Sequence, residues 1–175
     1  SAGTMMAQHL SRKVDASQWQ ITVVDGHATH YYQPGFLFMP FGVNTPDQIR
    51  KPKSQFIPRS VEFIQKQAEL IETDSNSVTL ADGLKVDYDI LIIATGARVE
   101  PGETDGLIGD HWLKSVFDFY TFEGSLALRD RLAAWEGGNL VVHITEMPIK
   151  CPVAPLQFAF LAADFFRHKK MRDLV

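Results

Sequence analysis

Hydrophobic and polar residues follow two different periods along the first half of the chain. Apolar residues at helical spacing predict a helix over 4–13, and a β-branched run predicts a short strand at 20–25. Residues 61–93 alternate with a period of two around a turn at 74–77. This alternation predicts an antiparallel meander that leads into a fully buried strand at 89–94.

The helical period returns in the second half of the chain. Apolar positions over 118–135 predict a helix that stops before Gly137 and Gly138. The apolar run at 139–144 predicts a second buried strand. Residues 156–170 predict another helix, whose almost wholly apolar part we assign to core packing.

Three segments show no period and are predicted loops. Residues 29–58 hold five prolines among many aromatic residues, and a loop of this length is usually functional or mobile. Residues 97–115 form a second loop. The third, 145–154, separates a predicted strand from a predicted helix and contains Cys151, the only cysteine in the chain.

The order of these elements predicts an α/β fold. The chain enters a helical pattern directly after residues 1–3 and ends at 172–175 in what looks like another strand, so we expect an internal piece of a longer protein. Strand, loop and helix recur in the order of a nucleotide-binding unit. We predict a partial Rossmann-like domain with an antiparallel meander at 1–115, lacking its first strand, and the beginning of a second Rossmann-like domain at 116–175.

Composition narrows the classes of function. A hydrophobic content of 45% predicts a folded core. The net charge of −4, with no long basic run, argues against nucleic-acid binding. A single cysteine excludes an internal disulfide, and the six histidines share no metal-ligand spacing, so we expect no metal site. No segment reaches the roughly 20 apolar residues of a membrane span, and the first ten residues lack the features of a signal peptide.

Gly3 and Asp25 match the second half of a dinucleotide-binding motif. That motif places a glycine-rich turn between strand and helix, and an acidic residue for the ribose about 20 positions later. Asp25 ends the next predicted strand, 22 residues after Gly3. Taken alone, these two residues leave an alternative open. The first residues would then not belong to a dinucleotide-binding motif, and Asp25 would be a solvated strand end. The stretch YDILIIATG at 88–96 adds an apolar strand that ends in small residues, where backbone can approach a ligand closely.

The loop that holds Cys151 lies where a nicotinamide-binding unit would need glycine. Residues 145–154 contain no glycine, so a pyrophosphate could not lie close to their backbone. Lys150 precedes the cysteine and a predicted helix N-terminus follows it, and both favour the thiolate. A buried, inert cysteine is the alternative interpretation.

Together these motifs resemble the sulfide:quinone oxidoreductases and the flavin subunits of flavocytochrome c sulfide dehydrogenases, flavoproteins with two dinucleotide-binding domains. The resemblance runs along the whole chain and rests on SAG at 1–3, the strand to Asp25, YQPG at 32–35, ATG at 94–96 and KCPVAP at 150–155. The chain departs from the pattern in two ways. Val153 stands where many members have glycine, and many members have a second active cysteine upstream that is missing here.

The resemblance implies an FAD-dependent oxidoreductase that oxidises sulfide and passes the electrons to a quinone. It implies that Cys151 is catalytic and carries sulfur, either as a persulfide or in a bond to the flavin. The implied FAD-binding residues are Ser1, Ala2, Gly3, Asp25, Gly26, His27, Gln33, Ala68, Ala94, Thr95, Gly96 and Pro152. The 29–58 loop is expected on the flavin side of the fold. The parent protein is expected to be cytoplasmic or peripheral on the inner face of the cytoplasmic membrane, with a homo-oligomer left open.

Two alternatives stay open beside this interpretation. A type II NADH dehydrogenase-like flavoprotein shares the ATG motif at 94–96, but it should carry a second glycine motif that 145–154 lacks. A catalytically inactive piece of such a flavoprotein is the other alternative. We expect the chain by itself to be inactive.

Overall fold

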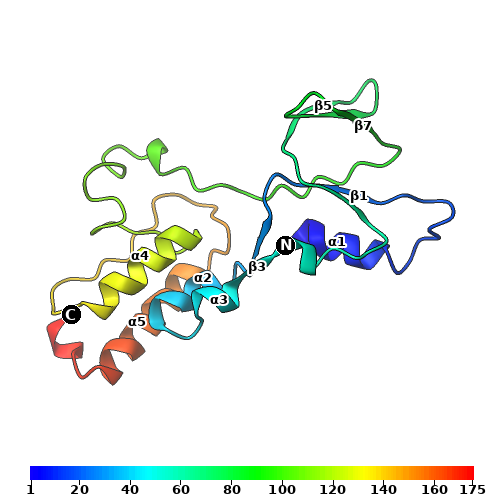
Figure 1. Ribbon diagram of the computed structural model, residues 1–175. Helices are drawn as coiled ribbons and strands as arrows, with labels where there is room; N and C mark the ends of the chain where they lie inside the picture. Colours follow the sequence, from blue (N-terminus) through cyan, green and yellow to red (C-terminus); the bar gives the residue numbers. More distant parts are fainter. The chain divides into compact units, whose positions relative to one another are not determined.

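The computed structural model describes residues 1–175, and the contacts within it divide the chain into two compact units (Figure 1). The first unit contains residues 1–31 and 50–96, and the second contains residues 32–49 and 97–175. These contact units are not the predicted domains, whose boundary at residue 115 stays a prediction.

A helix and a parallel strand pair form the beginning of the first unit. Helix α1 spans Ala2–Leu10, close to the predicted helix. Strand β1, Thr22–Val24, pairs in parallel with β4, Glu62–Ile64. The prediction that β4 opens the antiparallel meander was therefore wrong. The segment between the two strands is long enough to return the chain to the same end of β1, as a parallel connection requires.

The remainder of the meander is confirmed as a three-stranded antiparallel sheet. Strand β5, Ala68–Glu72, pairs with β6, Ser77–Leu80, which pairs in turn with β7, Lys85–Asp87. The alternation of the sequence is reflected in β6, where Val78 and Leu80 are buried. The two apolar residues of β6 thus share one buried face, as the period of two predicts, whereas Leu70 and Ile71 of β5 are exposed.

Residues 29–58 are not the unstructured loop that was predicted, because short elements divide them. In the first unit, β2, Thr29–Tyr31, pairs antiparallel with β3, Arg50–Pro52, and the 3₁₀ turn η2, Lys53–Gln55, follows. In the second unit lie α2, Gly35–Phe38, the 3₁₀ turn η1, Met39–Phe41, and α3, Pro46–Ile49. Pro40 and Pro46 stand in first helical turns and Pro52 ends a strand, where a missing N–H costs little.

The two predicted buried strands, 89–94 and 139–144, were wrong. Neither run forms a strand, and both are largely exposed: Ile90 is 66% and Val141 78% accessible. A β-branched run becomes a buried strand only where neighbouring strands bond its backbone and other elements cover its faces. No strand of the chain pairs with either run. The predicted strand start at 172–175 was also wrong, because the 3₁₀ turn η4 spans Arg172–Leu174.

Two helices build the core of the second unit. Helix α4, Phe122–Ala133, follows a loop in which only the 3₁₀ turn η3, Pro101–Glu103, is regular. Helix α5, Ala154–His168, faces α4 with residues spaced four apart, Phe158, Ala162 and Phe166. These residues pack with Leu128 and Leu132 of α4. The assignment of α5 to core packing holds for that face only, because Leu156 and Phe160 are exposed. None of the helices combines the length and apolar character that crossing a bilayer demands.

Candidate functional site

The N-terminus of α1 lies close to the ATG motif of the first unit. A Cβ added to Gly3 would stand 3.3 Å from the Cβ of Ala94, so glycine permits a closer approach there than a larger residue would. Gly96 has a φ of 79°, in the left-handed region that favours glycine. Ser1 occupies the N-cap position of α1, and its Oγ donates to the carbonyl of Tyr31 at 3.3 Å. The structure thus brings together Gly3 and Ala94, which the sequence motifs assign separately to the cofactor site.

Asp25 directly follows β1 and has both carboxylate oxygens engaged. Oδ1 accepts the backbone N–H of His27 at 2.9 Å, and Oδ2 pairs with the ammonium group of Lys53. Burial raises the pKa of Asp25. The hydrogen bond and charge of Lys53, together with the His27 N–H, outweigh that effect, so its pKa lies below the ordinary value. The carboxylate is therefore held ionised in a fixed hydrogen-bonded position.

Lys53 is a residue that sequence reasoning missed. It opens η2, its N–H donates to the carbonyl of Ala28 at 2.7 Å, and it is only 7% exposed. Lysine is almost never this buried without a partner. In the sequence it stands in a basic, proline-containing stretch without hydrophobic periodicity, so no pattern indicated that Lys53 would be buried. The hairpin of β2 and β3 brings it to Asp25 across 28 residues.

The other predicted cofactor residues of the first unit are placed as follows. Gly26 lies against Gln67, where an added Cβ would come within 3.4 Å of the Gln67 side chain. Ala68 follows Gln67 in the chain; it is the first residue of β5 and is exposed. His27 is exposed at the turn after Asp25. Ala2, Thr95 and Gly96 are also exposed.

The second unit contains the cysteine loop. Cys151 is exposed and has a φ of 56°, a left-handed conformation that is uncommon for a side-chain-bearing residue. Its carbonyl accepts the N–H of Ala154, the first residue of α5, at 3.0 Å. Cys151 therefore lies directly ahead of the helix N-terminus, as predicted. Pro155 occupies the first turn of α5, and Pro152 is exposed between them.

Two polar side chains contact this loop. Lys150 Nζ donates to Oε1 of Gln33 at 2.6 Å, so the structure places Gln33 beside the cysteine loop. Tyr120 donates its hydroxyl to the Cys151 carbonyl at 3.4 Å. Burial, and then the charge of Cys151, raise the pKa of Tyr120 above its ordinary value. Sequence reasoning missed Tyr120, because its place beside a run of helical apolar residues indicated packing.

The candidate site residues, predicted and newly found, thus fall into two groups, one in each contact unit. The first contains Gly3, Ala94 and the Asp25–Lys53 pair, and the second contains Gln33, Lys150, Cys151 and Tyr120. Neither group coincides with two shallow hollows of the surface. One hollow, of about 470 Å³, lies at the turn 71–75, and the other, of about 360 Å³, is lined by η1 and the ends of α4 and α5.

No family model matches the chain. The mitochondrial sulfide:quinone oxidoreductase of Dictyostelium discoideum is 24% identical over 176 residues, which cover 100% of this chain and 39% of that protein. The epsilon subunit of the NADH-dependent phenylglyoxylate dehydrogenase of Aromatoleum evansii is 28% identical over 135 residues, covering 74% of this chain and 32% of that protein.

Among solved structures, the sulfide:quinone oxidoreductase from the hyperthermophilic bacterium Aquifex aeolicus aligns with a TM-score of 0.71 at 20% identity. The alignment covers 99% of this chain and 39% of that one. The chain therefore spans well under half the length of the relatives it matches, and it shares their mixed α/β fold over that part. By sequence and by fold, the chain is a distant homologue of the sulfide:quinone oxidoreductases.

Proposed function

We propose that the protein carrying this chain is an FAD-dependent oxidoreductase that oxidises sulfide at Cys151 and passes the electrons to a quinone. The homologue from Dictyostelium is named for this reaction, and it matches the chain over its full length. The proposal concerns the parent protein, since the chain covers 39% of that relative.

The observation that carries the proposal is the environment of Cys151. The thiol is exposed, so a small solute reaches it from solvent. The loop around it is held by Gln33 through Lys150 and by Tyr120 through the Cys151 carbonyl. A cysteine that served only packing would be buried among apolar side chains. An exposed cysteine beside a lysine and a helix N-terminus is instead the arrangement expected of a reactive thiolate.

The chemistry assigned to Cys151 is the capture of one sulfur atom. When the sulfur of HS⁻ bonds to the Cys151 thiolate, the products are a persulfide anion, one proton and two electrons. A bound flavin supplies the two-electron acceptor that this oxidation requires. Lys150 precedes Cys151 in the chain, and its ammonium group adds positive charge to the loop in which HS⁻ and the persulfide would carry negative charge.

The residues of the first unit fit the adenosine end of FAD. A carboxylate has about four lone-pair sites, and Asp25 uses one for Lys53 and one for the His27 N–H. Two remain for the two vicinal hydroxyls of a ribose. The close approach of α1 to Ala94, permitted by Gly3, fits a backbone that must pack near a pyrophosphate.

We expect Cys151→Ser in the intact protein to abolish sulfide-dependent quinone reduction while FAD stays bound. Serine fills nearly the same space but cannot carry sulfane sulfur. Steady-state turnover with sulfide and a soluble quinone, and the flavin absorbance of the purified protein, are the two measurements. Met147→Leu, an exposed change in the same loop, serves as the control and should leave turnover intact.

The proposal fails if Cys151→Ser keeps more than about a tenth of wild-type turnover, a loss below about 1.4 kcal/mol in barrier height. It also fails if the intact wild-type protein contains and binds no flavin.

A further inference from the structure

Lys53 presents a physical question that the proposed function leaves unanswered. A nearly buried ammonium group lies against the carboxylate that we assign to the adenosine ribose. Burying a charge costs free energy unless a partner compensates it. An apolar residue at this position would avoid that cost, so the charge is expected to serve a purpose beyond packing.

The geometry around Asp25 indicates what the purpose is. The two carboxylate oxygens have different partners, Lys53 on Oδ2 and the His27 N–H on Oδ1, so the plane of the carboxylate is set from both sides. The His27 bond spans only two residues and belongs to a local turn. Lys53 is anchored separately. Its backbone N–H donates to the carbonyl of Ala28, and the strand that directly precedes it, β3, pairs with β2.

We propose that Lys53 is a positioning residue for ribose recognition: it holds the Asp25 carboxylate in the orientation that leaves one acceptor site on each oxygen for the 2′- and 3′-hydroxyls of the FAD adenosine. The inference rests on the proposed FAD binding and names a residue in that site which sequence motifs do not contain. Lys53 itself acts through Asp25 and does not contact the ribose.

Loss of the ammonium group has a definite consequence in this arrangement. Burial opposes the charged form of Asp25, and Lys53 is the largest of the effects that compensate it. Without Lys53, the carboxylate keeps only the His27 N–H and is free to rotate about that bond. A rotated or protonated carboxyl no longer offers two acceptors to a vicinal diol. Recognition of the hydroxyl pair should then be lost, whereas contacts to the rest of FAD remain.

The test uses the intact apoprotein, with FAD and its 2′-deoxyadenosine analogue as ligands and flavin fluorescence as the readout. Wild type should bind FAD about tenfold more tightly than the analogue, the expected effect of one hydrogen bond to a charged acceptor. In Lys53→Met this preference should fall to less than about twofold, and Lys53→Arg should restore part of it. Lys51→Met, which removes an exposed lysine on β3, should keep the full preference.

Comparing two ligands on one variant separates positioning from a folding defect, because a general loosening of the site weakens both ligands equally. If Lys53→Met prefers FAD over the analogue as strongly as wild type does, Lys53 is a structural strut and the inference is wrong. If wild type binds FAD without any preference for the 2′-hydroxyl, Asp25 is not the ribose acceptor and the inference is again wrong. If the intact wild-type protein binds no FAD, the proposed function fails as well.

Discussion

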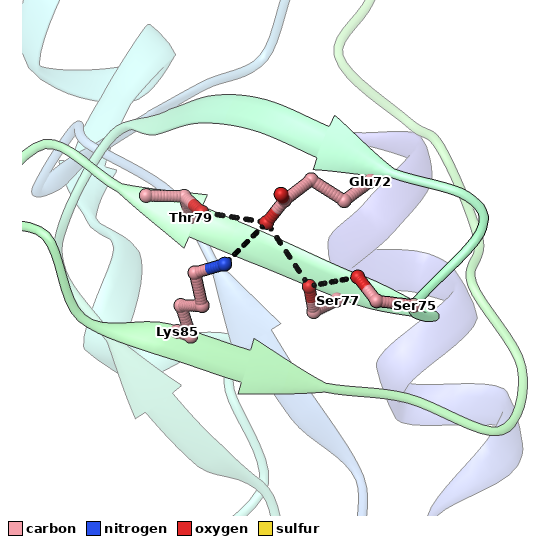
Figure 2. A network of polar contacts seen from close by, with 5 residues as sticks. All are labelled: Glu72, Ser75, Ser77, Thr79 and Lys85. Carbon is pink, nitrogen blue, oxygen red and sulfur yellow. Dashed lines mark hydrogen bonds and ion pairs between the residues drawn. The ribbon is translucent and has the colours of Figure 1, made fainter.

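Among the carboxylates of the first unit whose pKa lies below the ordinary value, Asp25 and Glu72 differ in their surroundings. Asp25 is partly buried, and its pKa falls because Lys53 and the His27 N–H outweigh the effect of burial. Glu72 lies on the surface of the sheet, where Lys85, Ser77 and Thr79 all donate to its Oε2, at 2.8, 3.3 and 3.2 Å (Figure 2). The hydrogen bond from Lys85, and then its charge, lower the pKa of Glu72 most. Single side chains thus join β5 to both of the strands that follow it.

The Glu72 network predicts a pH dependence of stability. Because the pKa of Glu72 is lower in the folded state, its contribution is present above the ordinary value of 4.5 and is lost as pH falls through the folded pKa. Wild type should therefore melt at a higher temperature than Glu72→Gln near pH 6, and the difference should shrink as the pH falls below 4.5 toward about 3 (both roughly, from the linkage relation). Circular dichroism melts across this range are the measurement.

Lys85→Met provides the partner control for the same network, since it removes the main donor to Glu72. It should show the same loss near neutral pH and the same convergence in acid. Glu69→Gln, an exposed change on the same strand, should follow wild type. A Glu72→Gln deficit of equal size at both pH values would mean that packing, rather than charge, explains it.

At the scale of elements, the start of α4 shows how a helix end is specified. Thr121 is the N-cap, and its Oγ1 accepts the N–H of Gly124 at 3.0 Å. Asp118 accepts the N–H groups of Tyr120 and Thr121 on Oδ1, at 2.9 and 2.7 Å. This arrangement brings Asp118 so close to the first turn that only glycine fits at position 124. The sequence predicted the helix four residues too early, because apolar spacing continues through the capping segment.

Gly124→Ala should destabilise α4 although alanine is the better helix former. The added Cβ would lie 2.2 Å from Oδ2 and 2.6 Å from the carbonyl oxygen of Asp118, so backbone would have to move. Alanine gains about 1 kcal/mol in helix propensity, and overpacking typically costs about 1–3 kcal/mol. Hydrogen exchange of the α4 amides should accelerate in the variant.

Gly102→Ala is the matched control for this change. Its added methyl group would come no closer than 3.4 Å to the side chain of Ile108, an ordinary contact. Exchange in α4 should stay as in wild type. Equal or slower exchange in Gly124→Ala would show that Asp118 moves aside at little cost and that the capping arrangement is not specific for glycine.

In the molecule as a whole, the proposed ribose site and the cysteine site belong to different contact units. The Asp25–Lys53 pair belongs to the first unit, and Cys151 with Gln33 and Tyr120 belongs to the second. Residues 32–49 leave the first unit between β2 and β3 and join the second, where Phe41 packs against Phe158. One segment of chain therefore follows Asp25, the proposed ribose acceptor, and also supplies Gln33 to the cysteine loop.

The loop that contains Cys151 predicts that the parent protein does not use a nicotinamide. Residues 145–153 contain no glycine, and prolines remove backbone donors at 148 and 152, so a pyrophosphate has no cradle there. NADH should neither bind nor bleach the flavin absorbance in anaerobic mixing, whereas sulfide should bleach it. One relative is named as NADH-dependent, so mixing with NADH and mixing with sulfide distinguish the two kinds of flavoprotein. Rapid bleaching by NADH would favour the dehydrogenase-like alternative.

Features that depend on neighbours in the chain could be predicted before the structure was known. Helical spacing specified α1, α4 and α5, alternation specified the β5–β7 sheet, and the position of Cys151 ahead of α5 followed from its neighbours in the chain. The motif also placed Asp25 at the end of β1. Each of these rests on interactions between residues a few positions apart, whose periodicity can be read directly.

Which distant segments meet could be learned only from the three-dimensional fold. It paired β4 with β1 in parallel, divided the predicted loop between two units, and left 90–93 and 141–144 exposed in place of two expected strands. It also brought Lys53 to Asp25 and Tyr120 to Cys151. Strand pairing and the burial of a charge depend on partners far away in sequence, and no local period records which partner the chain will find.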